Sequence, residues 1–470
     1  MAHKFHPSIL REYDIRGIFG KTLNLEDAKI LGQIFGTKVK RSGGSVVCVG
    51  YDVRLSSWDL ADALTSGLVK SGIRVLKIEQ GPTPLLYFAV HEKNADGGIM
   101  VTGSHNPPEY NGFKMVLNGK PFFGEEIAQL NKIASKQDFE EGPGTVEIVD
   151  VQDAYIKKIL NGFRESATQI KPLSVGWDPG NGATCVIIYD LVQKLPGRHF
   201  LINELPMGTF PAHAPDPTLP EALEQLQKLV KENNLSIGLA FDGDGDRLGA
   251  VDEDGKIVWG DQLLALLTED VLKHNPGAPI IADVKCGQNL FQAIEAQGGK
   301  PIMWKTGHSH IKKKMKEVGA PLAGEMSGHI FFADNYFGYD DAIYAALRVL
   351  ASLMNAGLSL KEWSNRQPKT FATPEIRLEC DGFDKFKVID QLKTHLTKSN
   401  VSFNDIDGVR LTLKEGWWLL RASNTEEILV ARGEGHTEKD LQKILNHMDH
   451  YLLAAGIKMR KSNGKYSIEA

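Results

Sequence analysis

Short apolar runs alternate with segments of helical periodicity along most of the chain. Val46–Gly50 is apolar and rich in β-branched residues, and from Ser57 onward apolar residues recur at the spacing of one helix face. Ile73–Ile78 then has the pattern of the next strand. This alternation predicts βαβ units, in which helices cover a largely parallel sheet.

The same pattern begins again twice. Leu173–Trp177 and Pro279–Val284 are further strand-like runs, and each leads into a loop that contains glycine. We therefore expect three tandem α/β domains of related topology, with mixed, largely parallel sheets.

The segment after Phe371 has a different pattern. Asp384–Lys398 and Thr437–Ala455 have helical periodicity, and the strand-like pieces Trp417–Arg421 and Ile428–Ala431 lie between them. This predicts a C-terminal α+β domain. Turn-rich stretches divide the chain into domains at 1–150, 151–255, 256–369 and 370–470, which we expect to surround a central cleft.

Composition excludes several classes of partner. The 470 residues carry 54 Lys and Arg against 59 Asp and Glu, a formal net charge of −5, which argues against a nucleic-acid-binding surface. The one basic cluster, Lys312–Lys314 with Lys316, is expected to be a solvated helix face. No apolar run approaches the roughly 20 residues that span a membrane, and the first residues lack a signal core. With four widely spaced cysteines, these features predict a cytoplasmic protein with no membrane partner.

Asp242, Asp244 and Asp246 place three carboxylates at alternate positions, with glycine between them. They follow Ile237–Phe241, an apolar run that predicts a strand. Like charges so close together repel unless a cation neutralises them, and oxygen ligands suit Mg²⁺ or Ca²⁺. The alternative is a solvated acidic turn, since Asp and Gly are common turn residues. An EF-hand is excluded because Arg247 stands where that loop needs glycine, and because the flank is strand-like.

A second segment, Thr102–Lys114, follows another strand-like run, Gly98–Val101. Ser104 therefore lies on a loop at the C-terminal end of a strand, a usual place for chemistry in open α/β sheets. A serine hydroxyl is a weak nucleophile that needs a base or a metal, and His105 and Lys114 are near it in sequence. The residues around Ser104 are also plain loop formers, so this segment alone is a weak signal.

These two motifs and three others resemble the motifs of the α-D-phosphohexomutase superfamily. Gly324–His329 is similar to the family's sugar-reading loop, Arg421–Glu426 to its phosphate-binding loop, and Arg11–Gly17 to its N-terminal signature. The motifs occur in the family's order, and the resemblance runs from about residue 10 to about residue 430. Within the superfamily the chain most resembles the bacterial bifunctional phosphomannomutases/phosphoglucomutases.

The resemblance implies reversible transfer of phosphate between C1 and C6 of mannose and glucose phosphates. Ser104 would carry the phosphoryl group, and a hexose 1,6-bisphosphate would be the intermediate. Mg²⁺, held by Ser104 and the three aspartates, would neutralise charge on the phosphate, and glucose 1,6-bisphosphate is the expected activator. The resemblance implies hexose phosphates as binding partners and implies no protein partner. The implied substrate-binding residues are Tyr13, Arg247, Lys285, His308, Glu325, Met326, Ser327, Gly328, His329, Arg421, Ala422, Ser423, Asn424 and Thr425.

The sugar hydroxyl must lose a proton in this reaction, so a base is needed. Lys114, His105 and Arg16 match the family's candidates. A lysine base requires burial or neighbouring cations to lower its pKa, and an arginine base is harder to defend because its pKa is so high. The sequence leaves this choice open.

Three other functions compete with this interpretation. Phosphoglucosamine mutases resemble the chain but usually carry Gln in place of Met326 and Ala in place of Gly103. A non-catalytic sugar-phosphate-binding protein should show damage at the nucleophile or the metal loop, and neither loop is damaged. A phosphatase would result if water reached the phosphoserine. Finally, Ala431–Gly435 departs from the family, which more often has an aromatic or larger residue after the arginine, and we expect the glycines of this segment to loosen the end of the strand.

Overall fold

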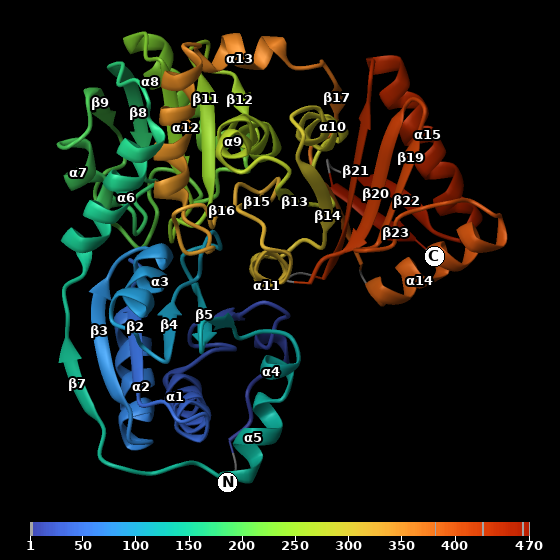
Figure 1. The fold of residues 1–470 in the computed structure, drawn as a ribbon. Helices are drawn as coiled ribbons and strands as arrows, with labels where there is room; N and C mark the ends of the chain where they lie inside the picture. The colour runs from blue at the N-terminus through green and yellow to red at the C-terminus, as the bar shows by residue number, and fades with distance from the viewer. Residues whose placement is uncertain (1–2, 381, 425–426, 463–464, 470) are drawn as a thin grey trace.

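Four β-sheets, each with helices packed against it, follow one another along the chain (Figure 1). They belong to a computed structural model that describes residues 3–380, 382–424, 427–462 and 465–469. The predicted fold class is confirmed: three α/β segments of related topology with mixed sheets are followed by an α+β segment.

The first sheet joins parallel central strands to antiparallel strands at one edge. Its order is β1-β5-β4-β2-β3-β7, with β6 paired to β5, and β2 runs parallel to both β3 and β4. Side chains alternate along β2, so Val47 and Val49 face the core under α1 and α2 while Cys48 faces the core under α3. The strands are β1 Ile15–Ile18, β2 Val46–Tyr51, β3 Arg74–Gln80, β4 Gly97–Val101, β5 Tyr110–Leu117, β6 Lys120–Pro121 and β7 Thr145–Ile148. The helices are the 3₁₀ turn Pro7–Ile9, α1 Leu25–Arg41, α2 Ser57–Lys70, α3 Thr83–Glu92, α4 Glu125–Ala128 and α5 Leu130–Lys136.

The second and third sheets repeat the parallel centre with an antiparallel edge. Their orders are β12-β11-β10-β8-β9 and β14-β13-β15-β16. The second contains β8 Leu173–Asp178, β9 Gly197–Leu201, β10 Ile237–Phe241, β11 Leu248–Asp252 and β12 Ile257–Val258, with α6 Gln152–Ser166, α7 Cys185–Val192, the 3₁₀ turn Pro220–Leu223 and α8 Glu224–Asn233. The third contains β13 Pro279–Asp283, β14 Lys300–Trp304, β15 Leu322–Gly324 and β16 Ile330–Phe332, with α9 Gly260–His274, α10 Gln288–Ala296, α11 His308–Val318, α12 Ala342–Ala356 and α13 Leu360–Arg366. No single helix in the described part of the chain is long and apolar enough to cross a bilayer, and α12 with α13 passes that test only as a pair bent by 74°.

The fourth sheet is antiparallel except where β18 meets β23. Its order is β19-β20-β21-β18-β23-β22, with β17 paired to β21. The two predicted helices are confirmed, and each starts one residue after a side-chain cap, Asp384 for α14 and Thr437 for α15. The elements are β17 Phe371–Ala372, β18 Ile376–Glu379, α14 Lys385–Lys398, β19 Val409–Leu413, β20 Gly416–Ala422, β21 Ile428–Gly435, α15 Glu438–Ala454, β22 Lys458–Ser462 and β23 Lys465–Glu469.

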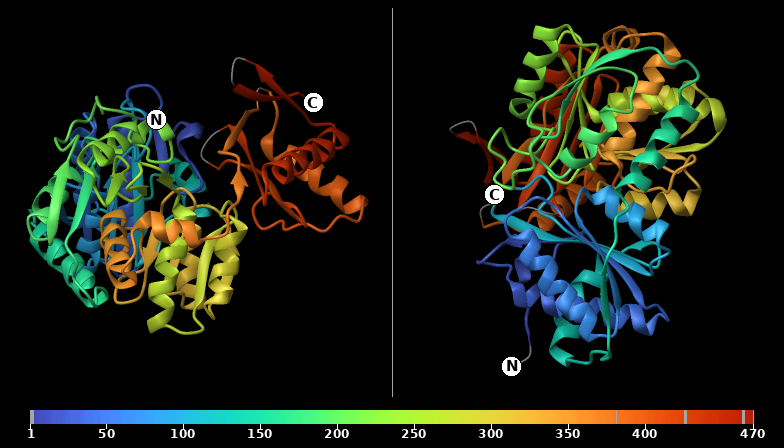
Figure 2. Two further views of the ribbon diagram at one scale, coloured as in Figure 1. Left: turned by 90° about the horizontal axis from the view of Figure 1, so that it is seen from above. Right: turned by 90° about the vertical axis from the view of Figure 1, so that its left-hand side faces the viewer.

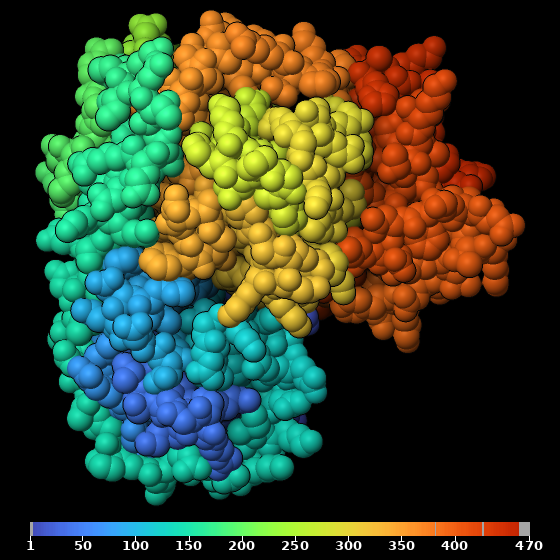
Figure 3. All heavy atoms as spheres, viewed as in Figure 1, coloured from blue at the N-terminus to red at the C-terminus, as the bar shows by residue number. Residues whose placement is uncertain are grey.

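One hydrophobic core continues through the first three segments, and the fourth has a core of its own, with a small cluster of Val284, Trp417 and Leu419 between the third and the fourth. The shared core continues from Leu86 on α3 through Ile187 on α7 to Leu350 on α12, and the fourth core gathers around Leu392 and Trp418. From above, the C-terminal body stands apart from the other three (Figure 2, left). The space-filling view shows a notch between this body and the N-terminal one (Figure 3). We therefore expect the fourth body to move as a unit.

The expectation that glycines loosen the end of β21 is wrong. The strand continues through Gly435, which pairs with both Gly416 and Phe371, and the whole strand is buried. A Cβ on Gly435 would lie only 2.3 Å from the backbone nitrogen of Leu441. Glycine at this position therefore lets α15 pack closely on the strand.

We expect Gly435→Ala to lower the stability of the C-terminal body by about 1–3 kcal/mol, because backbone atoms of α15 would have to move. Thermal denaturation measures this. Gly433→Ala is the matched control, since its nearest neighbour is a flexible leucine methyl 3.1 Å from the new Cβ. Equal destabilisation by the two variants would contradict the explanation.

Candidate active site

Ser104 lies on the loop between β4 and β5, and the residue is 2% exposed. Its φ of 49° is left-handed, which costs a non-glycine residue about 1–2 kcal/mol. Ser104 Oγ lies 3.1 Å from Asp242 Oδ2 and 3.1 Å from His105 Nδ1. A buried serine on a strained backbone, between a carboxylate and an imidazole, has the environment of a nucleophile.

A buried ion pair between Asp52 and Arg54 holds this loop, and neither residue was predicted from the sequence. Both side chains are fully buried. Asp52 accepts from Thr102 Oγ1 at 2.7 Å and from the backbone nitrogen of Gly103 at 3.1 Å. Arg54 donates to Asp52 and to four carbonyl oxygens of the loop, those of Ser104, Asn106, Pro107 and Tyr110. The only available signal was the place of both residues directly after β2.

The same ion pair explains the glycine before the serine. A Cβ on Gly103 would lie 2.4 Å from Arg54 Cζ. Alanine, which phosphoglucosamine mutases usually carry here, would therefore displace the guanidinium as it stands in this chain.

Asp242, Asp244 and Asp246 are fully buried on the loop between β10 and β11, and their oxygens lie within 4.8 Å of one another. Lys114 Nζ lies 2.7 Å from Asp244 Oδ2 and also contacts Asp246. Burial lowers the pKa of Lys114, but the carboxylates outweigh it and the net shift is upward, so Lys114 is a cation here. Burial and the two neighbouring carboxylates raise the pKa of Asp242. One buried oxygen each of Asp244 and Asp246 has no hydrogen-bond partner, which fits a site for a hard divalent cation.

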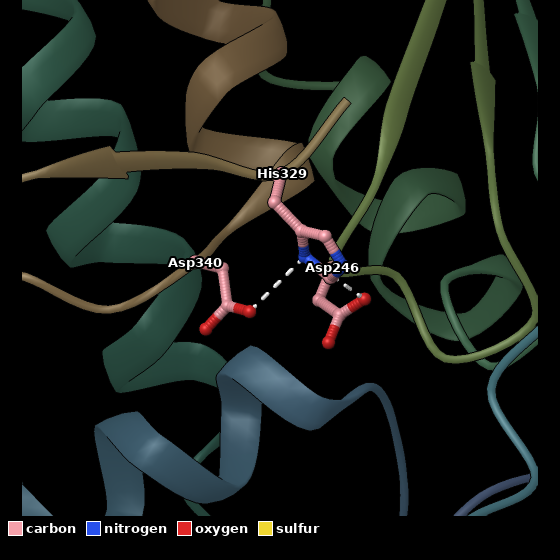
Figure 4. Close-up of side chains that lie close together, drawn as sticks. All are labelled: Asp246, His329 and Asp340. Atoms are coloured by element: carbon pink, nitrogen blue, oxygen red, sulfur yellow. Dashed lines mark ion pairs between the residues drawn. The ribbon is translucent and has the colours of Figure 1, made fainter. Parts of the chain in front are cut away.

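Asp246 also belongs to a second polar group, which it forms with His329 and Asp340 (Figure 4). His329 Nδ1 is 3.1 Å from Asp340 Oδ2 and 3.5 Å from Asp246 Oδ1. On the other side of the ring, Arg247 Nε donates to His329 Nε2 at 3.1 Å. Asp340 was not predicted as a site residue, because aspartate is common near the start of a helix and needs no functional explanation there.

Lys312 completes this group, although it was predicted to lie on a solvated helix face. Its Nζ lies 2.9 Å from Asp340 Oδ1 and 4.4 Å from the centre of the Tyr87 ring. The side chain is only 8% exposed. The prediction of a solvated face for Lys312–Lys314 is therefore wrong for Lys312.

The predicted sugar-reading loop lies next to this group. Glu325 Oε1 accepts from the backbone nitrogen of Gly307 at 2.6 Å, and Ser327 Oγ donates to the other oxygen at 3.1 Å. Burial raises the pKa of Glu325. His308 begins α11, and its ring stacks on that of His329 with 5.7 Å between centroids. The loop is completed by Met326 and by Gly328, whose φ is 94°.

The predicted phosphate-binding loop begins at the end of β20 in the fourth sheet. Arg421 is 5% exposed, and its Nε donates to Asp407 Oδ2 at 2.9 Å, a partner that the sequence did not reveal. Asn424 Nδ2 donates to the hydroxyl oxygen of Tyr13, so the fourth body touches the first here. The neighbouring residues Ala422 and Ser423 are buried, and Thr425 lies outside the described residues.

Two predicted residues lie against other partners. Arg16 donates to the carbonyl oxygen of Gly103 at 2.8 Å and so supports the serine loop. Lys285 Nζ lies 2.7 Å from Glu375 Oε1, and this ion pair joins the third and fourth segments. The described residues thus form one group around Ser104, one around Glu325 and His329, and one around Arg421.

Comparisons with known proteins agree with this arrangement. Four sequence models match in order, described as Phosphoglucomutase/phosphomannomutase, alpha/beta/alpha domain I (residues 7–141), domain II (153–255), domain III (259–371) and C-terminal domain (375–450). Phosphomannomutase/phosphoglucomutase of Pseudomonas aeruginosa is 44% identical over 437 residues, which cover 93% of this chain and 94% of that one.

The chain is also similar to solved structures of phosphohexomutases. A phosphoglucomutase/phosphomannomutase family protein from Burkholderia thailandensis is 40% identical, with a TM-score of 0.89 over 96% of this chain and 98% of that one. N-acetylphosphoglucosamine mutase of Aspergillus fumigatus, solved with GlcNAc-6P and magnesium, shares the fold at 15% identity, with a TM-score of 0.65 over 96% of this chain and 97% of that one.

Proposed function

The chain belongs to the phosphoglucomutase/phosphomannomutase family, and we propose that Ser104 is the residue that carries its phosphoryl group. The enzyme is a phosphohexomutase: it moves phosphate reversibly between C1 and C6 of hexose phosphates through a phosphoserine and a hexose 1,6-bisphosphate. The observation that carries the proposal is the 3.1 Å contact between Ser104 Oγ and Asp242, the first of three fully buried carboxylates.

We propose Mg²⁺ as the metal. Asp242, Asp244 and Asp246 would hold it, with an oxygen of the phosphate on Ser104. The donor set is all oxygen, which suits a hard cation, and the Aspergillus fumigatus structure contains magnesium. When bound, Mg²⁺ neutralises charge on the transferring phosphoryl oxygens.

Lys114 supplies the counter-charge to the three carboxylates in the described arrangement, and this gives a test. We expect Lys114→Met to destabilise the metal-free protein by about 3–5 kcal/mol, because a buried ion pair loses one partner. Mg²⁺ should then raise the melting temperature more in this variant than in the wild type, which thermal denaturation in EDTA and in Mg²⁺ measures. Lys120→Met, at an exposed lysine on the same sheet, is the control. An equal Mg²⁺ effect in all three proteins would contradict a metal at this place.

The proposed roles at the sugar follow from the contacts. Glu325 and Ser327 would bind sugar hydroxyls, and Arg421 with Ser423 and Asn424 would bind the phosphate that does not react. Activation by glucose 1,6-bisphosphate is proposed because it would phosphorylate Ser104, and a variant of the Aspergillus fumigatus enzyme has been solved with that compound.

For the base we favour His329 over the three predicted candidates. Lys114 is held as a cation by carboxylates, and Arg16 is occupied with the serine loop. Burial lowers the pKa of His105 well below its usual value, and its Nδ1 faces Ser104 itself. His329 lies beside the metal carboxylates with the carboxylate of Asp340 behind it, the arrangement of a histidine base and its orienting acid.

A coupled mutase assay with Mg²⁺ and a trace of glucose 1,6-bisphosphate tests the substrate range. Mannose 1-phosphate and glucose 1-phosphate should turn over at comparable rates. Turnover of glucosamine 1-phosphate alone would move the chain to the phosphoglucosamine branch, and no turnover of any of the three would contradict the catalytic function.

A further inference from the structure

The tautomer of His329 can be read from its neighbours. Arg247 Nε is only a donor, and it donates to His329 Nε2 at 3.1 Å. Nε2 must therefore be the acceptor, and the neutral ring carries its proton on Nδ1. That nitrogen lies 3.1 Å from Asp340 Oδ2 and 3.5 Å from Asp246 Oδ1.

This tautomer excludes a metal at the same place. The facing atoms of Asp246, His329 and Asp340 lie within 4.8 Å of one another, which alone would suit a cation. A metal on Nδ1 needs the lone pair of that nitrogen, but a neutral imidazole has one lone pair, and it points at Arg247. The two carboxylates therefore lie beside a protonated Nδ1, which has no lone pair for a metal.

Of the two carboxylates, Asp340 is the better placed to orient the ring. It is fully buried and fixed by Lys312, whose Nζ is 2.9 Å from the oxygen that does not face the histidine. Burial raises the pKa of Asp340, but Lys312, His329 and His308 outweigh it and the pKa lies well below its usual value. Asp246, in contrast, already contacts Lys114 and is a proposed metal ligand.

We propose that Asp340 is a positioning residue that keeps His329 in the Nδ1–H tautomer, with the lone pair of Nε2 free for the substrate once Arg247 turns to the phosphate. This rests on the proposed role of His329 as the base. Nε2 accepts the proton of the sugar hydroxyl as that oxygen bonds to phosphorus and the bond from phosphorus to Ser104 Oγ breaks. The Ser104 alkoxide then attacks the other phosphate, and the departing sugar oxygen takes the proton back from His329.

Asp340→Asn tests the proposal because Lys312 dictates how the new amide lies. Lysine is only a donor, so the amide oxygen should face Lys312 and the NH₂ group should face Nδ1. His329 would then take the Nε2–H tautomer and lose the hydrogen bond that Arg247 Nε donates to Nε2. We expect kcat to fall about 10⁴-fold with little change in KM, as when an orienting aspartate is lost elsewhere.

The readout that does not depend on activity is ¹⁵N NMR of the histidine rings, measured above the pH at which an ordinary histidine titrates. His329→Gln assigns the signal. We expect Nδ1–H in the wild type, Nε2–H in Asp340→Asn, and Nδ1–H again when Lys312→Met is added, because the amide is then free to turn. Asp334→Asn, in the same loop but paired with Arg348, is the control and should keep the wild-type tautomer and kcat.

An Nε2–H signal in the wild type would overturn the proposal. So would an unchanged tautomer in Asp340→Asn, whether or not kcat falls, since any loss would then be structural or electrostatic. If the wild-type mutase assay fails while the tautomers behave as expected, the proposed function is at fault and the positioning role of Asp340 stands.

Discussion

Ser104→Ala is expected to lower kcat/KM by about 10⁴-fold or more, the scale seen when a covalent nucleophile is removed. The physical reason is that the methyl group cannot accept phosphate, so no path to the bisphosphate remains. Because each factor of ten corresponds to about 1.4 kcal/mol, the loss is at least about 5.5 kcal/mol of transition-state stabilisation. A coupled assay at saturating Mg²⁺ measures it.

The variant should keep its fold, since Ser104 contributes its hydroxyl to two contacts, with Asp242 and His105. Ser135→Ala, at an exposed serine on α5, is the control and should be as active as the wild type. If Ser104→Ala retained more than about a hundredth of the activity, a covalent role for this serine would be excluded.

Arg54→Lys is expected to reduce both activity and stability, although Arg54 is placed behind the serine loop and outside the reacting groups. A lysine keeps the charge but has neither the planar fork nor the reach to hold four carbonyl oxygens at once. The left-handed backbone of Ser104 would lose its support. We expect kcat to fall about 100-fold and the free energy of unfolding to fall by about 3 kcal/mol, as for a damaged buried ion pair.

Arg74→Lys is the matched control, because Arg74 lies at the start of β3 in an exposed pair with Glu147. An exposed pair contributes at most about 1 kcal/mol, so this variant should behave like the wild type. Wild-type kcat in Arg54→Lys would show that the loop does not depend on the guanidinium.

The strands and the acidic loop could be predicted because their signals are local. Ile237–Phe241 is apolar at every position except one glycine, and the three aspartates follow it directly, so the strand and its loop are visible in one short window. The structure has β10 with these bounds. The helix predicted from Ser57 begins there for the same reason.

The partners of the site residues could not be predicted because they come from other helices, strands and loops, which only the fold brings into contact. Asp340 contacts Lys312 from another element, and Arg421 contacts Asp407, which lies before the preceding strand. Lys312 illustrates the limit: in sequence it stands among other lysines, and only the packing of α11 against Asp340 and Tyr87 buries it.

The glycines of β21 failed as a signal for a similar reason. In sequence, Gly433 and Gly435 weaken a strand, because glycine has no side chain to pack. In the fold, the missing side chain is what lets α15 approach Gly435. Whether glycine weakens or stabilises this strand depends on the packing of α15, which the residues of the strand alone do not show.

A phosphoryl-transfer chase tests the central claim most directly. The enzyme is first incubated with glucose 1,6-bisphosphate and Mg²⁺, and intact mass with peptide mapping locates the phosphate. Unlabelled mannose 1-phosphate is then added in a single turnover. We expect one phosphate, on Ser104, that leaves at least as fast as kcat and appears in a hexose 1,6-bisphosphate. Phosphate on another residue, or its release as inorganic phosphate without a bisphosphate, would contradict a phosphoserine mutase mechanism.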